Sequence, residues 1–128
     1  QLTVANRSVD KAQTMVERFA ADAKRGETSL LVQSFSELSQ HYDVVINATS
    51  AGLTESTLHL PAVIIQSNTL AYDMMYGRET PFMQQARAAG AQVADGLGML
   101  VEQAAEAFYL WHGMRPDTAT VIKSFRQS

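Results

Sequence analysis

Apolar residues along this 128-residue chain fall into two alternating patterns. Short apolar or β-branched runs alternate with longer segments in which apolar residues recur every three or four positions, and these patterns predict strands and amphipathic helices. We expect strands at residues 2–5, 29–35, 43–49, 68–75 and 92–94. We expect helices at residues 9–24, 80–89, 98–112 and 117–125, and a brief helical turn at 36–38. This order favours an α/β fold with a mostly parallel sheet and right-handed crossovers.

The ends of the predicted helices carry matching signals. Ser8 and Asp117 are suitable N-caps, and Pro81 stands at a first helical position. Gly26 and Gly113 follow the last apolar positions of two helices and predict their C-terminal ends. These signals support the helix boundaries that the apolar pattern gives.

Two further expectations concern burial. The segment 43–49 is apolar at successive positions, which is typical of a strand in a parallel sheet that is covered on both faces. The aromatic residues Phe108, Tyr109 and Trp111 are expected to pack the last helices together.

Composition narrows the class of protein. Hydrophobic residues make up 46% of the chain and charged residues 18%, which suits one compact domain rather than disorder. The formal net charge is -3, so we expect no nucleic-acid partner. The absence of cysteine excludes disulfides, cysteine-bound zinc and thiol catalysis. No apolar run is long enough for a membrane span and none resembles a signal peptide, so a cytoplasmic location is expected.

The histidines give no metal or catalytic signal. His41, His59 and His112 are widely spaced and fall in predicted loops or at a helix end. We therefore expect no metal site.

The first candidate site follows the first strand. In open α/β sheets, ligands bind beyond the carboxyl ends of the strands. Asn6-Arg7-Ser8 occupies such a position, with Lys11 in the first turn of the next helix. A cation is unfavourable at a helix N-terminus, but a bound phosphate turns that cost into an attraction. An arginine here is typical of binding to the 2′-phosphate of NADP, whereas NAD-binding proteins place an acidic residue here. A solvated basic turn is the alternative interpretation.

Two more segments follow the central strands. Ile46-Asn47-Ala48-Thr49-Ser50-Ala51-Gly52 combines small and hydroxylic residues, which would let the backbone approach a flat ring or a ribose closely. An ordinary polar turn is the alternative. Tyr72-Asp73-Met74-Met75-Tyr76, together with Thr80-Pro81-Phe82, groups aromatic, acidic and thioether side chains, although packing explains any one of them equally well.

The fourth segment, Asp95-Gly96-Leu97-Gly98-Met99-Leu100-Val101-Glu102-Gln103, joins a strand to a helix. It lacks the third glycine of a dinucleotide phosphate loop, since Val101 stands at that position. We interpret it as backbone that passes close to a ligand or to another element. Gln103 lies in a mostly apolar helix, where an amide must either find a protein partner or face a substrate.

Taken as a set, these four segments resemble the shikimate dehydrogenase family, and Met114-Arg115-Pro116-Asp117 resembles the family's C-terminal turn. The resemblance implies a Rossmann-like three-layer domain with NADP as cofactor and interconversion of 3-dehydroshikimate and shikimate. By this resemblance, the cofactor-binding residues are Asn6, Arg7, Ser8, Lys11, Ala48, Thr49, Ser50, Met74, Gly96, Met99 and Leu100. The substrate-binding residues are Tyr76 and Gln103.

The same resemblance implies that parts of the family's pattern lie outside this sequence. The family's first strand, its Gly-rich loop and its N-terminal substrate domain, which carries the acid–base residues, have no counterpart in residues 1–128. We therefore expect an incomplete cofactor domain without catalytic residues, inactive by itself. The missing strand would lie between the strands that end at Ala5 and Thr49, so their exposed edges are expected either to pair with each other or to recruit another chain as a homo-oligomer.

Two other interpretations stay open. One is a self-contained nucleotide-binding or oligomerisation module without catalytic activity. The other is a quinate/shikimate dehydrogenase relative. A relative that prefers NAD would carry an acidic residue near position 7, which this chain does not.

Overall fold

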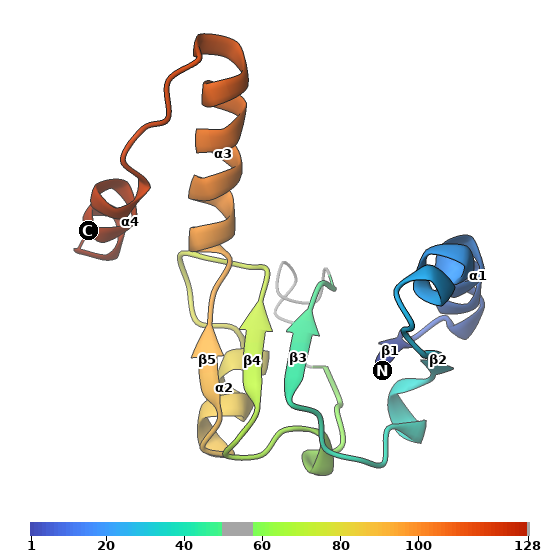
Figure 1. Ribbon diagram of the computed structural model, residues 1–128. Helices are drawn as coiled ribbons and strands as arrows, with labels where there is room; N and C mark the ends of the chain where they lie inside the picture. Colours follow the sequence, from blue (N-terminus) through green and yellow to red (C-terminus); the bar gives the residue numbers. More distant parts are fainter. Residues whose placement is uncertain (50–57, 128) are drawn as a thin grey trace. The chain divides into compact units, whose positions relative to one another are not determined.

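The computed structural model describes residues 1–49 and 58–127, in which strands and helices alternate along the chain (Figure 1). The chain divides into two compact units. The N-terminal unit comprises Gln1–His41 and His59–Ile64, and the C-terminal unit comprises Tyr42–Leu58 and Ile65–Ser128. Within the described residues, no helix is long and apolar enough to cross a bilayer.

The N-terminal unit is built around a strand–helix–strand motif. Strands β1 (Leu2–Ala5) and β2 (Leu30–Gln33) pair in parallel, with Leu2 opposite Leu30 and Ala5 opposite Gln33. Helix α1 (Val9–Arg25) connects them and packs on both strands, with Ala12 buried. This is the crossover that parallel neighbours require.

Two short 3-10 helices complete this unit: η1 (Phe35–Glu37) and η3 (Ala62–Ile64). The backbone N–H and the hydroxyl of Ser34 each donate a hydrogen bond of 2.7 Å to the Glu37 carboxylate. These bonds, the backbone one first, lower the pKa of the exposed Glu37 side chain. They fix the turn that follows β2.

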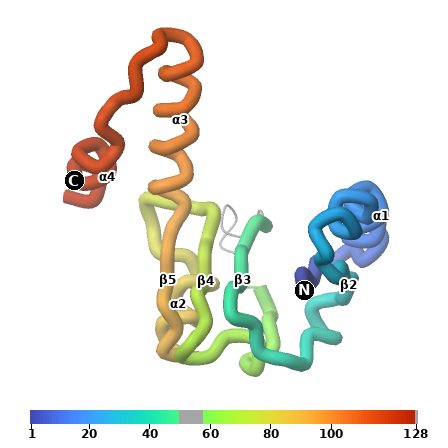
Figure 2. Tube along the Cα trace, in the orientation of Figure 1, coloured from blue at the N-terminus to red at the C-terminus, as the bar shows by residue number. Residues whose placement is uncertain are grey.

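The C-terminal unit contains a three-stranded parallel sheet in the order β3-β4-β5. Its strands are β3 (Val44–Asn47), β4 (Leu70–Asp73) and β5 (Gln92–Ala94). Helix α2 (Pro81–Ala88) connects β4 to β5 and packs on both strands, a path that Figure 2 follows along the chain. Helices α3 (Leu97–His112) and α4 (Thr118–Gln127) follow β5 and contact each other. The core of this unit contains Ile65, Ala71, Phe82, Met83, Ala86, Leu97, Val101 and Ala105.

The predicted elements are confirmed in kind and order. Every predicted strand and helix is present, with ends that differ by a few residues, and all the strand pairs are parallel. Gly113, at φ 68°, ends α3 in the left-handed conformation that favours glycine. Asp117 caps α4, since its carboxylate accepts from the backbone N–H groups of Ala119 and Thr120. The α/β fold class follows directly from the apolar pattern.

Two expectations about burial are wrong. β3 is not covered on both faces, because Val44 and Ile46 are 51% and 61% exposed while Asn47 is buried. Successive side chains of a strand point to opposite faces, so only one face of β3 contributes to the core. Trp111 is 78% exposed and does not pack the last helices together, because it lies near the end of α3 beyond the buried positions Val101 and Ala105.

Candidate functional site

The β1–α1 turn forms a first candidate site, in the N-terminal unit. β1 ends at Ala5, and the side-chain oxygen of Asn6 accepts a hydrogen bond of 3.3 Å from the backbone N–H of Ser8. Ser8 occupies the N-cap of α1 in an extended conformation, but its hydroxyl makes no cap bond. The beginning of α1 therefore lacks a side-chain cap, and a ligand oxygen can take that role.

The charges beside this turn suit an anion. Arg7 and Lys11 are both exposed, and neither belongs to an ion pair among the described residues. Asp10, also in the first turn of α1, is the acidic residue of this turn. The helix N-terminus and two exposed cations together favour a group with more than one negative charge, such as a phosphate.

A second candidate site lies at the carboxyl edge of the β3-β4-β5 sheet, in the C-terminal unit. The parallel register places Asn47 opposite Asp73 and Tyr72 opposite Ala94, so the three strands end together (Figure 1). The structure thus brings the segments after these strands to one edge, as predicted from the sequence. These segments hold Ala48, Thr49, Met74, Tyr76 and Gly96, whereas Ser50 lies outside the described residues.

Gly96 is the tightest point of this edge. A Cβ at this position would lie 2.7 Å from the carbonyl carbon of Met74, and closer still to its oxygen. The Gly96 N–H also donates to the Met75 carbonyl at 2.9 Å. The prediction that this segment passes close to another element is confirmed, and the element is the backbone that follows β4.

The remaining predicted residues differ in exposure. Met74, Tyr76 and Met99 are 41%, 46% and 40% exposed, which leaves two thioethers and one phenol open to a ligand. Ala48 is exposed, while Thr49 and Leu100 are half-buried. Gln103 is exposed on α3, so it needs no protein partner. A surface of this kind offers apolar contact to a flat ring rather than charge.

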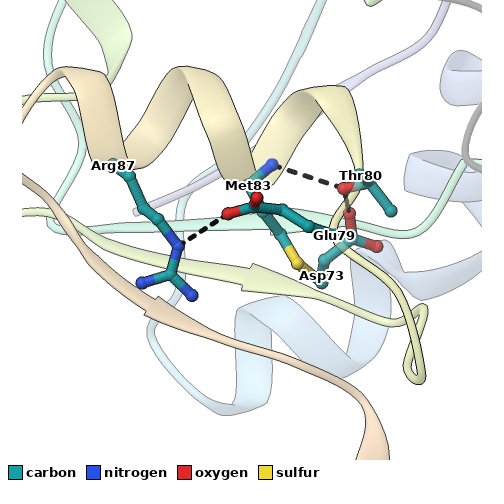
Figure 3. A network of polar contacts seen from close by, with 5 residues as sticks. All are labelled: Asp73, Glu79, Thr80, Met83 and Arg87. Atoms are coloured by element: carbon teal, nitrogen blue, oxygen red, sulfur yellow. Dashed lines mark hydrogen bonds and ion pairs between the residues drawn. The ribbon is translucent and has the colours of Figure 1, made fainter.

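Asn47, Asp73 and Thr80 form a buried polar cluster at this edge, and no role for it was predicted from the sequence. Asp73 and Thr80 are 0% and 2% exposed, and the Thr80 hydroxyl donates to the Asp73 carboxylate at 2.5 Å (Figure 3). Asn47 is 5% exposed, and its side-chain N–H donates to the same carboxylate at 3.1 Å. The available signal was that two neighbouring apolar strands both end in an Asn or Asp.

The C-terminal unit also carries a pocket of about 270 Å³ beside α2, lined in part by Arg78, Arg87 and Arg126. Arg87 pairs with Glu79 at 2.9 Å (Figure 3), and Arg126 lies 3.7 Å from Asp95. These carboxylates offset most of the positive charge, and no predicted site residue lines the pocket. We therefore do not include it in the candidate site.

Known proteins match nearly the whole chain. Residues 96–124 match the shikimate 5′-dehydrogenase C-terminal domain. A protein of Methylobacillus flagellatus named shikimate dehydrogenase (NADP(+)) is 58% identical over 127 residues, which cover 98% of this chain and 46% of that protein. The chain thus spans about half the length of the curated relatives that it matches.

Solved structures agree with this match. An Ael1 enzyme from Pseudomonas putida is 44% identical with a TM-score of 0.85, over 98% of this chain and 45% of that one. A shikimate 5-dehydrogenase from Thermus thermophilus, solved with NADP(H) and shikimate, is 28% identical with a TM-score of 0.72, over 98% and 45% of the two chains. Nearly the whole chain is therefore similar to shikimate dehydrogenases, over about half of their length.

Proposed function

We propose that this chain is the NADP-binding part of an oxidoreductase that interconverts 3-dehydroshikimate and shikimate. The observation that carries the proposal is the uncapped beginning of α1 with the exposed cations Arg7 and Lys11 beside it. The names of the curated relatives, identical to this chain at 45–58% of positions, support the same cofactor and reaction.

The residues of the β1–α1 turn fit the adenosine end of NADP. Arg7 and Lys11 supply positive charge for the 2′-phosphate, while Asn6 and Ser8 supply polar groups for the ribose. An NAD-binding turn would place a carboxylate at the position of Arg7, where it would repel that phosphate. The turn therefore supports NADP over NAD.

The carboxyl edge of the C-terminal unit fits the nicotinamide end. Glycine at position 96 lets two backbone segments meet, and the side chains of Met74 and Met99 are left exposed beside them. Ala48, Thr49 and Leu100 complete the proposed ring contacts, and Ser50 follows them in the sequence. Thioethers and small side chains can pack on the faces of a ring and exclude water from it.

When bound, the cofactor supplies the hydride for reduction of the substrate carbonyl. The residues of this chain bind and orient: the cationic turn holds the phosphate, and the methionines hold the ring. Tyr76 and Gln103, both exposed, are proposed to contact the substrate through hydroxyl and amide groups. We assign no proton-transfer role to this chain and propose that its 128 residues do not catalyse the reaction by themselves.

Steady-state kinetics of the full-length protein that carries this sequence test the proposal. With 3-dehydroshikimate, we expect oxidation of NADPH with a kcat/KM at least about tenfold above that for NADH, since loss of one charged contact costs about that factor. The 128-residue chain alone is expected to give no oxidation above background. A preference for NADH, or turnover by the chain alone, would contradict these expectations.

A further proposal concerns association of the isolated chain. β3 is the outer strand of its sheet, and Val44 and Ile46 on it are exposed, so we propose that a second copy pairs with this strand. Light scattering of the isolated chain should show dimers or larger species. An Ile46→Lys variant should show a smaller fraction of these associated species. A monodisperse unsubstituted monomer would contradict the proposal.

A further inference from the structure

The Asp73 carboxylate holds together three segments at the carboxyl edge of the C-terminal unit. One of its oxygens accepts from the Asn47 side chain at 3.1 Å and from the Thr80 hydroxyl at 2.5 Å. The other accepts from the backbone N–H of Met75 at 2.9 Å. Asp73 is 0% exposed, and within the described residues no cation pairs with it. These three donors therefore take the place of water around the buried charge.

The first of these bonds determines how the chain leaves β3. While its N–H group donates to Asp73, the Asn47 side-chain oxygen accepts from the backbone N–H of Thr49 at 3.1 Å and from its hydroxyl at 2.8 Å. The turn that carries Ala48 and Thr49 is thereby tied to the buried carboxylate.

The bond from the Met75 N–H determines how the chain leaves β4. The Met75 N–H donates to Asp73, and the Met75 carbonyl in turn accepts from the Gly96 N–H at 2.9 Å. One carboxylate thus connects the turn after β4 with the beginning of α3, at the point where Gly96 touches the Met74 backbone.

The bond from the Thr80 hydroxyl serves a different part of the unit. The Thr80 hydroxyl donates to Asp73 and accepts from the Met83 N–H at 3.3 Å, which caps α2 (Figure 3). α2 packs on β4 and β5 and holds none of the proposed cofactor contacts. This bond therefore has a structural role that can be separated from the other two.

A buried carboxylate is a costly way to join three segments if stability alone matters, since well-packed apolar residues often stabilise as much. What the carboxylate adds is direction, because each donor must lie on a lone pair. We propose that Asp73 is a positioning residue, acting through Asn47 and Met75, that sets the segments holding Ala48, Thr49, Met74 and Gly96 for the nicotinamide ring. This inference rests on the proposed function.

Binding to two ligands separates this role from general stability. NADPH carries both the 2′-phosphate and the nicotinamide, whereas adenosine 2′,5′-bisphosphate carries the 2′-phosphate and no nicotinamide. In the full-length protein, Asp73→Asn replaces one of the two accepting oxygens with an N–H group, which then faces either the Asn47 and Thr80 donors or the Met75 N–H. We expect the Kd for NADPH to rise about tenfold and the Kd for adenosine 2′,5′-bisphosphate to change less than about twofold, since one charge-assisted bond is lost at one end only.

Three further variants complete the design. The exchange Asn47→Asp with Asp73→Asn restores a carboxylate–amide pair in reverse, and it should recover most of the NADPH affinity. Thr80→Val breaks the α2 bond alone, and it should lower the Tm while leaving the ratio of the two Kd values unchanged. Asn47→Leu should weaken the binding of NADPH and not that of adenosine 2′,5′-bisphosphate, as Asp73→Asn does. It tests the positioning role if Asp73→Asn does not fold.

Each outcome has one meaning. Equal weakening of both ligands by Asp73→Asn or Asn47→Leu, or an unchanged NADPH Kd in the folded variant, would overturn the positioning role. A shift of the Kd ratio in Thr80→Val as large as in Asp73→Asn would also overturn it. If the unsubstituted protein binds adenosine 2′,5′-bisphosphate but Asp73→Asn does not raise the Kd for NADPH selectively, only this inference is lost. If it binds neither ligand, the proposed function is lost as well.

Discussion

The two units of this protein present their candidate sites in different ways. In the N-terminal unit, the site consists of exposed side chains at the beginning of one helix, with Arg7 and Lys11 free of ion pairs among the described residues. In the C-terminal unit, it consists of backbone segments that a buried carboxylate and a glycine contact hold in place. Among the residues that the structure describes, eight of the eleven buried apolar ones belong to the C-terminal unit.

This difference fits the two kinds of ligand surface that we propose. A phosphate is recognised by charge, which long exposed side chains can supply with little help from the core. A flat ring is recognised by shape, which requires backbone and small side chains to be fixed by packing. Substitutions at the candidate site of the N-terminal unit should therefore change the selectivity for NADPH over NADH. Substitutions at the close backbone contact of the C-terminal unit should change the free energy of unfolding and the NADPH affinity together.

The strongest test of this contrast is Gly96→Ala. The new methyl group would meet the Met74 backbone, so the segments after β4 and β5 must move apart. We expect the free energy of unfolding of the full-length protein to fall by about 3 kcal/mol, as for an overpacked core position, with a loss of NADPH affinity. Urea unfolding and NADPH titration measure the two effects.

Gly98→Ala is the matched control. This glycine lies in the first turn of α3, and a Cβ there would meet nothing within 4 Å. Alanine is the better helix former, so stability should stay the same or rise by up to about 1 kcal/mol. If both variants lose stability equally, the close contact at Gly96 is not the cause.

Arg7→Gln tests the N-terminal unit. Removing the charge should raise the KM for NADPH about thirtyfold, change the KM for NADH little, and leave the Tm within about 1 °C, since Arg7 is exposed. Steady-state kinetics with both cofactors measure the selectivity. Arg25→Gln, at the other end of α1, where Arg25 pairs with Asp22, should change neither KM. A large drop in Tm for Arg7→Gln would contradict the contrast between the units.

The smallest expected effect lies outside both sites, at the N-cap of α4. The hydroxyl of Thr120, at 2.5 Å, and then its backbone N–H hold the pKa of the exposed Asp117 carboxylate below its ordinary value. A carboxylate with a lowered folded-state pKa stabilises the fold above its unfolded-state pKa, and this stability is lost as pH falls through the folded-state pKa.

Hydrogen exchange of the backbone amides of α4 should therefore become faster relative to that of α3 as the pH falls below the ordinary pKa range of aspartate. Asp117→Ala should remove this pH dependence and leave NADPH binding unchanged. An exchange ratio between α4 and α3 that stays constant with pH in the unsubstituted protein would contradict the assignment.

Particular residues show how far the sequence could predict this protein. The apolar spacing, Pro81 and the glycines at 26 and 113 were enough to place every helix, because these signals act over a few residues. The exposed face of β3 was wrongly predicted, because an apolar strand looks the same in sequence whether one or both faces are covered. The role of Asp73 was missed because its donors lie 26, 2 and 7 residues away, and only the register of β3 and β4 brings Asn47 to it.

The sequence by itself determined the order of the elements and the chemistry of the β1–α1 turn, since both depend on neighbours along the chain. Only the tertiary structure decided that Gly96 meets the Met74 backbone and that one buried carboxylate joins three segments. The physical reason is that these contacts form between residues far apart in the sequence, whose distance is set by strand pairing and core packing rather than by local preference.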